Sequence, residues 1–375
     1  MIRYSRRLAW DAPQNAFSRL LDARRAAGAH LLDLTVTNPT QVDLAYPHAE
    51  IAAALARVSD FTYRPEAAGS HAARLAIGAE PSRILLTAST SEAYSLLFKL
   101  LCDPGDEVLV PQPSYPLFEY LAALEAVRIV PYRLSYDGGW FVDFDTVDRA
   151  LSPRTRAIVV VNPNNPTGSF LKQPEADRLS AFGIPLISDE VFTDYALTEH
   201  PSRATLSDSH LWFGFSGLSK SAGMPQMKIG WITLHGPDAE IEPARDRLEL
   251  LLDTYLPVAT PIQSALPELL KIGAGIREQI RTRTKQNLAA LRDLLRDSAA
   301  HPLYTEGGWS AIVQLPNHIS EEEWITRLLT DHDVVVQPGY FFDMHVEAFV
   351  VVSLIAPLDT FREGITRLRA ATAQY

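Results

Sequence analysis

Cysteine is nearly absent from this chain: Cys102 is the only one among 375 residues. A single cysteine cannot form a disulfide within the chain, which favours a reducing compartment. Its place in the apolar run 100–102 predicts a packing role rather than a nucleophile. No apolar run reaches the roughly 20 residues that a membrane helix needs, and no apolar stretch follows the charged N-terminus as in a signal peptide. We therefore expect a cytoplasmic protein.

Positive charge is also scarce, because the formal net charge at pH 7 is −11. An acidic chain repels phosphate backbones, so we expect no nucleic-acid partner. A glycine-rich G-x-G-x-x-G segment after a strand is missing as well, which argues against a nicotinamide dehydrogenase. With 47% hydrophobic residues the chain has ample material for a core, and its length predicts one large domain plus a smaller one.

Short apolar segments dominate the first two thirds of the chain. Seven of them predict buried strands, and helical segments such as 91–101 and 173–182 lie between them. This alternation predicts an α/β domain with a largely parallel sheet. The strand segments are 83–88, 107–111, 128–134, 156–162, 184–189, 211–216 and 228–234.

The pattern changes after about residue 237, where helical spacing predicts one helix over 261–273 and a second over 277–297. Strand and helix segments then alternate to the C-terminus, which indicates a compact α+β unit. Near the N-terminus, 16–28 predicts a helix, and 31–40 predicts a short strand that enters a turn at Asn38-Pro39. We expect three regions: an arm and part of the small domain (1–45), a large domain (46–255) and a small domain (256–375).

Polar residues follow five of the predicted strands. In open α/β sheets, ligands bind beyond the carboxyl ends of the strands, so these residues predict a site at one sheet edge. They are Ser89-Thr90-Ser91, Pro113-Ser114-Tyr115-Pro116, Asn162 to Gly168, Asp189-Glu190 and Ser216 to Lys220.

This set of side chains suits pyridoxal 5′-phosphate, which needs an amine for its aldehyde, an acid for its ring nitrogen and a cradle for its phosphate. The chain has six lysines, and Lys220 alone sits directly behind a predicted buried strand. Burial there can lower the pKa of its amine toward neutrality. The sequence therefore predicts a pyridoxal-phosphate enzyme whose Schiff-base lysine is Lys220.

Five motifs also carry a family resemblance: PSYP at 113–116, NPNNPTG at 162–168, SDE at 188–190, SGLSK at 216–220 and EGG at 306–308. In this order they resemble the fold-type-I aminotransferases of the aspartate aminotransferase superfamily, and the resemblance runs from about 32 to 371. It implies an α/β fold with a mostly parallel, seven-stranded type of sheet in the large domain, and a smaller α+β domain.

The resemblance implies roles for the residues around the cofactor ring. Lys220 forms the Schiff base and shuttles the proton, and Asp189 pairs with the pyridine nitrogen. Asn165 hydrogen-bonds the ring oxygen, and Tyr115 stacks on the ring. Plainer roles remain open: a cap for Asp189, a turn for Asn165 and a core aromatic for Tyr115.

The resemblance also implies a phosphate site and substrate contacts. Ser89, Thr90 and Ser91 begin a helix whose free N–H groups suit a phosphate, although a helix cap without ligand is the alternative. The remaining phosphate contacts are Ser219, Lys228 and Tyr63, the last reaching the partner subunit of a homodimer. The substrate contacts are Thr37, Asn165 and Arg64, and no metal site is expected.

Three positions depart from the family pattern. Lys228 stands where the family usually has arginine, which keeps the charge and loses the bidentate fork. Phe192 stands where the family usually has a tyrosine, three residues after the aspartate that pairs with the ring nitrogen. Val351 occupies the position of the arginine that binds the substrate's α-carboxylate. The third departure puts the substrate in question, and Arg64 is our candidate for a replacement cation, with a solvated loop charge as its alternative.

The leading interpretation is an aminotransferase that moves an amino group from an amino acid or amine to a 2-oxo acid. The alternative keeps the fold and changes the reaction to a decarboxylase, a lyase or a carbon–carbon bond-forming synthase on a specialised substrate. A non-catalytic DNA-binding regulator on this fold is disfavoured, because the chain has no extra basic domain and retains Lys220.

Overall fold

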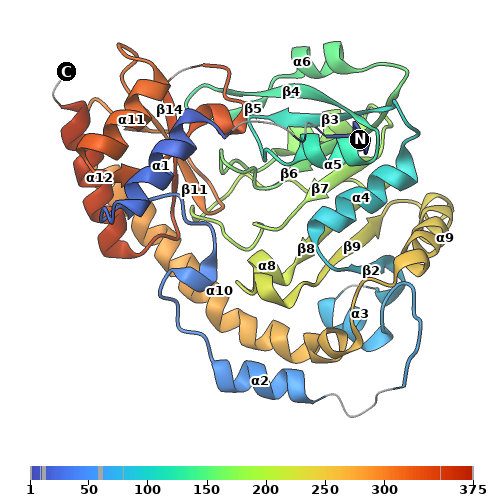
Figure 1. Ribbon diagram of the computed structural model, residues 1–375. Helices are drawn as coiled ribbons and strands as arrows, with labels where there is room; N and C mark the ends of the chain where they lie inside the picture. Colours follow the sequence, from blue (N-terminus) through green and yellow to red (C-terminus); the bar gives the residue numbers. More distant parts are fainter. Residues whose placement is uncertain are drawn as a thin grey trace.

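The apolar segments between 84 and 235 form one sheet of eight strands in the computed structural model, which describes residues 2–8, 10, 14–57, 62–78, 80–346 and 348–373 (Figure 1). The strand order is β2-β9-β8-β7-β6-β3-β4-β5. The strands are β2 (Ile84–Thr87), β3 (Glu107–Gln112), β4 (Arg128–Tyr136), β5 (Trp140–Val142), β6 (Thr155–Val161), β7 (Leu186–Asp189), β8 (Trp212–Gly217) and β9 (Gly230–His235).

Six of these strands run in one direction. Only β9, which is antiparallel to β2 and β8, and β5, which is antiparallel to β4, run the other way. All seven predicted strands are confirmed, and the α/β class with them. The sequence reading missed β5, a three-residue edge strand that forms a hairpin with β4 through a turn containing Gly138 and Gly139.

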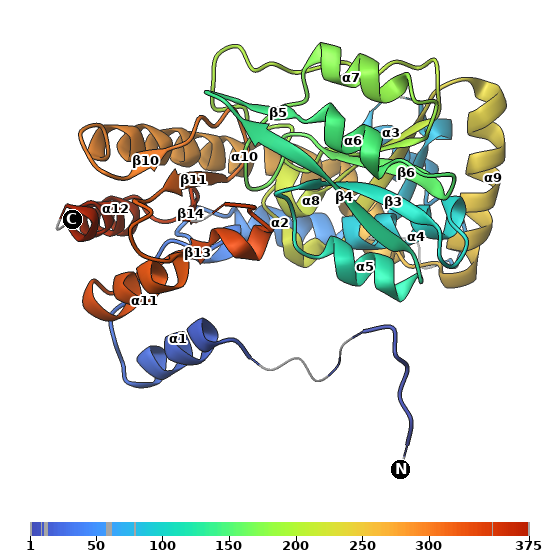
Figure 2. The ribbon, with the colours of Figure 1, turned by 90° about the horizontal axis from the view of Figure 1, so that it is seen from above.

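Helices cover both faces of this sheet (Figure 2). Side chains alternate across the strands, so that Val108 and Val110 pack on one side and Leu109 on the other. The first side is covered by α4 (Thr90–Leu101), α5 (Phe118–Leu124) and α9 (Asp238–Tyr255), and the second by α6 (Phe144–Ala150) and α7 (Gln173–Ser180). The partly buried Cys102 packs at the first side, and burial raises the pKa of its thiol to about 12.

A smaller sheet follows late in the chain, in the order β10-β11-β14-β13. The N-terminal segment joins this unit, because β1 (Leu32–Asp33) pairs in parallel with β12 (Val334–Val335), and α1 (Ala16–Ala26) packs against α11. The three-region division itself stays a prediction. The elements of the unit are β10 (His301–Pro302), β11 (Ser310–Gln314), β13 (Gln337–Pro338), β14 (Phe349–Ser353), α11 (Glu321–Asp331) and α12 (Leu358–Thr372).

One long helix, α10 (Thr260–Leu294), connects the two sheets, and here the sequence reading was wrong. Helical spacing predicted two helices, over 261–273 and 277–297, whereas the helix is continuous over 35 residues, or roughly 52 Å. A Cβ at Gly273 would lie 2.4 Å from the Cβ of Ala222, so glycine lets α10 pack closely on the segment after β8. Toward its other end, Asn287 donates hydrogen bonds to the Leu354 and Ala356 carbonyls.

Two further helices, α2 (His48–Ala56) and α3 (His71–Ile77), pack against α10. Within the described ranges, no helix is both long and apolar enough to cross a membrane. The same ranges contain no cluster of three or more histidine, cysteine, aspartate or glutamate side chains that could hold a metal ion.

Candidate active site

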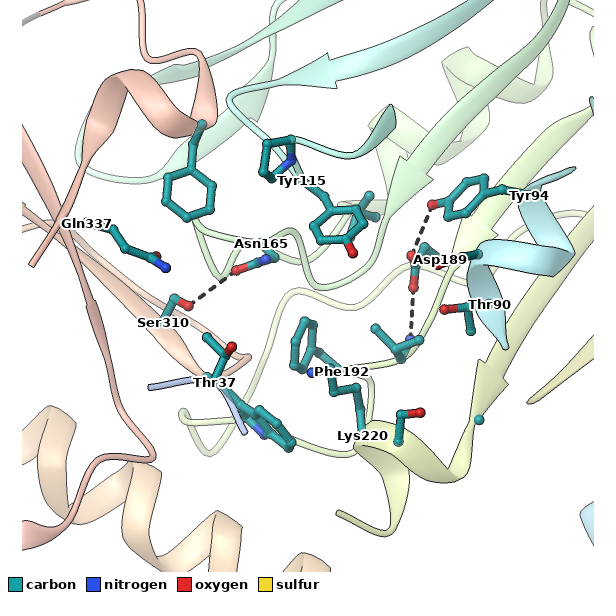
Figure 3. A pocket seen from close by; sticks show the side chains of 18 of the residues that line it. Thr37, Thr90, Tyr94, Tyr115, Asn165, Asp189, Phe192, Lys220, Ser310 and Gln337 are labelled. Atoms are coloured by element: carbon teal, nitrogen blue, oxygen red, sulfur yellow. Dashed lines mark hydrogen bonds between the residues drawn. The ribbon is translucent and has the colours of Figure 1, made fainter. Parts of the chain in front are cut away.

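A cavity of ≈ 290 Å³ lies at the carboxyl edge of the large sheet, where that edge faces the small sheet. One wall comes from the ends of β6, β7 and β8 and from the start of α4. The opposite wall comes from the N-terminal segment and the small unit. Figure 3 shows Thr37, Ser310 and Gln337 on that second wall, across the cavity from Thr90, Tyr94 and Asp189.

Lys220 projects into this cavity from α8 (Leu218–Ser221), the short helix that follows β8 directly. Burial lowers the pKa of its amine, and the carboxylate of Asp189 opposes that shift. Its Nζ lies 4.9 Å from the ring centre of Trp309 and 5.8 Å from that of Phe192. The Tyr195 hydroxyl donates a hydrogen bond to the Lys220 carbonyl and fixes the backbone behind the amine.

Asp189 is the last residue of β7 and is almost completely buried. Burial raises the pKa of its carboxyl to about 6. Two donors partly offset that effect: the Tyr94 hydroxyl at 3.0 Å and the Val191 N–H at 3.2 Å. The cavity therefore pairs a buried acid with a buried amine, and both have pKa values displaced toward neutrality, as at sites of proton transfer.

The N-terminus of α4 supplies the hydroxyls of Thr90 and Ser91, which line the cavity, and Ser219 adds a third from α8. Ser89 caps the helix, since its Oγ accepts a hydrogen bond from the Glu92 N–H at 3.2 Å, and its side chain is not part of the lining. Lys228 also lies outside the lining. It is exposed and has a left-handed backbone conformation with φ of 50°.

Asn165 and Tyr115 both line the cavity, as does Thr37. The Ser310 hydroxyl donates to Asn165 Oδ1 at 3.2 Å, so this contact joins the two walls (Figure 3). The Tyr115 ring packs edge-on against Phe118, with 6.0 Å between ring centres. Burial, assisted by the nearby Asp189, raises the pKa of the Tyr115 hydroxyl.

Tyr63 and Arg64 are not brought into this cavity. The Tyr63 side chain is 72% exposed, and the two residues border a separate recess of ≈ 50 Å³ beside Leu256 and Pro257. Within one chain, therefore, neither residue reaches Lys220. The roles predicted for them and for the other site residues remain predictions.

Phe192 and Val351, two of the departures from the family pattern, differ in whether they line the cavity. Phe192 lines the cavity beside Lys220. Val351 does not line it, because it is 1% exposed and packs with Trp140, Ile312 and Phe342 in an apolar cluster of the small unit. Its strand neighbour Gln337 contributes to the lining instead.

Sequence reasoning missed eight residues of the lining: Tyr94, Val161, Val191, Ile229, Trp309, Ser310, Gln337 and Phe342. A helical count could have found Tyr94, which lies three residues after Ser91 on the same face of α4. Trp309 and Ser310 directly follow the EGG motif at 306–308, which could have marked them. Gln337 and Phe342 have no such local signal, since they reach the cavity through the packing of the small unit against the large sheet.

The chain matches the family described as aminotransferase class I and II over residues 31–366. Among curated proteins, glutamate–pyruvate aminotransferase AlaA of Haemophilus influenzae is 25% identical over 378 aligned residues, which cover 93% of this chain and 92% of that protein. The arginine–pyruvate transaminase AruH of Pseudomonas aeruginosa is 26% identical over 390 aligned residues, covering 98% and 95%.

The fold has close counterparts among solved structures. An alanine aminotransferase from Pyrococcus furiosus superposes with a TM-score of 0.87 at 22% identity, and the match covers 100% of both chains. An aspartate aminotransferase from Thermotoga maritima superposes with a TM-score of 0.83 at 19% identity, covering 98% of this chain and 99% of that one.

Proposed function

Since the chain belongs to the family of class I and II aminotransferases, we propose that its amino-group transfer is carried out by Lys220 and Asp189 on pyridoxal phosphate. Aminotransferases of this family use that cofactor and act on amino acids and 2-oxo acids. The observation that carries the proposal is the cavity itself, in which a buried amine with a lowered pKa and a buried carboxylate share one enclosed space.

The side chains present suit each part of the cofactor. Asp189 offers a buried carboxylate for the protonated ring nitrogen, and because burial raises the pKa of that carboxyl, a cationic partner would stabilise its ionised form. Asn165 offers an amide to the ring oxygen, and Tyr115 offers an aromatic face. The hydroxyls of Thr90, Ser91 and Ser219 make no hydrogen bond within the described residues. Thr90 and Ser91 stand at the N-terminus of α4, which favours an anionic phosphate.

Two more residues would contact the phosphate. Ser89 would contribute from the capped turn of α4, and Lys228 would contribute its charge from the loop before β9.

We also propose a homodimer, in which Tyr63 and Arg64 of each subunit reach the cavity of the other. Their exposure and their distance from the cavity in a single chain support that arrangement.

When bound, pyridoxal phosphate withdraws electrons from the α carbon of the amino donor. Lys220 would hold the cofactor covalently, and its Nζ would be the base that accepts and returns the proton of that carbon. Burial lowers the pKa of this amine, which favours its uncharged, proton-accepting form. Asp189 would pair with the protonated ring nitrogen, and the aromatic rings of Trp309 and Phe192 exclude water around the amine.

A half-reaction tests the proposal. The protein loaded with pyridoxal phosphate is mixed with a panel of amino acids and amines, and the conversion of cofactor to its amino form is followed by absorbance. A 2-oxo acid should then restore the original spectrum. Release of carbon dioxide or ammonia without formation of the amino form would favour a decarboxylase or a lyase instead.

Two variants test whether Lys220 is the lysine that attaches the cofactor. Lys220→Ala should abolish the half-reaction, whereas Lys99→Ala should leave it intact, because Lys99 is a surface residue that pairs with Glu125 on the outer side of α4. Borohydride reduction followed by peptide mass analysis gives a readout independent of activity. Cofactor attached to any lysine other than Lys220 would contradict the assignment.

A further inference from the structure

Gln337 lies next to Val351, the position of the carboxylate-binding arginine in the family pattern. The two residues are direct partners in the antiparallel pair of β13 and β14, and residues opposite each other in such a pair lie on the same face of a sheet. Val351 is enclosed in an apolar cluster with Trp140 and Phe342, whereas Gln337 lines the cavity. Gln337 therefore presents a polar group to the cavity from the strand beside Val351.

The protein itself does not use this amide. Gln337 is half-buried, and its side chain makes no hydrogen bond within the described part of the chain. Figure 3 shows the side chain directed into the cavity, on the same wall as Thr37 and Ser310. A glutamine amide has two N–H donors, and polar groups inside a protein are normally satisfied by a partner. The amide of Gln337 is thus suited to an acceptor that arrives with a ligand.

The position of Asp189 indicates where a substrate carboxylate lies. Asp189 is on the opposite wall of the cavity, across from Gln337 (Figure 3). Aminotransferases of this family act on amino acids, so each donor brings an α-carboxylate together with its amino group. Repulsion between two carboxylates weakens as they move apart. The α-carboxylate is therefore most stable on the wall of Gln337, with the amino group toward Lys220 and the cofactor.

We propose, on the basis of the proposed function, that Gln337 binds the α-carboxylate of the amino-acid substrate, with its amide Nε2 donating hydrogen bonds to the carboxylate oxygens. A hydrogen bond to an ionised acceptor is roughly twice as strong as one between neutral groups, so a neutral amide makes a measurable contribution to affinity. The 2-oxo acid carries its carboxylate on the corresponding carbon and uses the same donors, because both substrates of an aminotransferase occupy one site in turn.

Two amines that differ only in the carboxylate test this inference. 2-Aminoisobutyrate has no proton on its α carbon, so it binds the loaded protein without aminating the cofactor, and tert-butylamine has a methyl group in place of the carboxylate. The dissociation constants of both are measured from the change in cofactor absorbance. Gln337→Leu should weaken binding of 2-aminoisobutyrate by about tenfold to a hundredfold, and should change binding of tert-butylamine by less than about twofold.

Two further variants serve as a rescue and a control. Gln337→Arg again supplies donors for the carboxylate and should keep the preference for 2-aminoisobutyrate that Gln337→Leu loses. Gln314→Leu makes the same substitution at an exposed glutamine of the small sheet, on β11, which does not line the cavity. Gln314→Leu should leave both dissociation constants unchanged.

The outcomes separate this inference from the proposed function. An unchanged ratio of the two dissociation constants in Gln337→Leu would overturn the role of Gln337 and leave aminotransfer intact. Loss of the ratio in Arg64→Ala, with Gln337→Leu unaffected, would overturn it in favour of a cation from the second subunit. Failure of every amino acid to convert bound cofactor to its amino form would overturn the proposed function, whereas the binding ratio needs no turnover and tests Gln337 separately.

Discussion

The hydrogen bond between Tyr94 and Asp189 gives a measurable prediction. Tyr94 is 1% exposed on α4, and its hydroxyl donates to Asp189 Oδ2 at 3.0 Å. Its ring packs against Phe98, Phe118 and Phe215, with ring centres 5.9, 5.2 and 4.5 Å away. Tyr94→Phe therefore keeps the packing and removes one of the two hydrogen bonds that stabilise the Asp189 carboxylate.

The magnitude follows from the charge on the acceptor. A hydrogen bond to a charged group contributes about 1.5–3 kcal/mol, and one pKa unit corresponds to about 1.4 kcal/mol. Without the hydroxyl, the pKa of Asp189 should rise by about one to two units above its present value of about 6. Since that pKa is already raised above its ordinary value, the associated stability is full at acidic pH and is lost as the pH rises through 6.

Thermal or urea unfolding of the cofactor-free protein at several pH values checks this reasoning. Relative to the unmodified protein, Tyr94→Phe should cost little extra at pH 5, where Asp189 is mostly protonated in both. At pH 8 or above it should cost about 1.5–3 kcal/mol more, because the carboxylate must then ionise without its donor.

Tyr132→Phe is the matched control. Tyr132 is equally buried, and its hydroxyl donates at 2.8 Å to the Val159 carbonyl, which does not titrate. Its destabilisation should be the same at pH 5 and pH 8. An equal cost of Tyr94→Phe at the two pH values would refute the proposed coupling to Asp189.

Four further predictions concern the cofactor, the assembly and the thiol. Lys220→Ala should still bind pyridoxal phosphate non-covalently but should lose covalent attachment after borohydride treatment; retained attachment would contradict its role. Phe192→Tyr adds a donor beside Lys220 and should move the pH titration of the cofactor absorbance to lower pH, and an unchanged or upward shift would show that residue 192 does not contact the cofactor. Light scattering should show a dimer, whereas an active monomer would rule out a shared site built with Tyr63. Iodoacetamide should leave activity intact, because the thiol of Cys102 has a pKa of about 12 and stays protonated; rapid inactivation would point to a different environment.

The large sheet and its edge could be predicted from the sequence because they depend on local patterns. Short apolar runs predict buried strands. Because ligands of open α/β sheets bind beyond the carboxyl ends of the strands, the residues that follow these runs, among them Asp189, Asn165 and Lys220, are then predicted to lie together at one site. Besides the missed β5, the wrong element is α10, which the sequence analysis divided into helices over 261–273 and 277–297. Glycine lowers helix stability by about 1 kcal/mol per residue. The close packing of α10 on Ala222, which Gly273 permits, outweighs this cost and keeps the helix continuous.

The wall of the cavity that comes from the N-terminal segment and the small unit could not be predicted in the same way. Gln337, Trp309 and Phe342 come from segments more than 85 residues beyond Lys220, and they reach the cavity only through the placement of the small sheet. Trp309 directly follows the EGG motif at 306–308, but nothing in the sequence around Gln337 and Phe342 distinguishes them from residues of an ordinary core. Val351 illustrates the reverse case, because its position was notable in the sequence while its side chain lies beneath the lining.

The continuous α10 connects the small unit, which forms one wall of the cavity, to the segment that carries Lys220. One end is hydrogen-bonded to the small unit through Asn287, and its middle rests on Ala222, two residues after the amine. Because α10 is continuous, it links the small unit to the backbone that follows Lys220. A Cβ added at Gly273 would lie 2.4 Å from the Cβ of Ala222, so we expect Gly273→Ala to displace the backbone beside Lys220 although the new methyl group touches neither cofactor nor substrate.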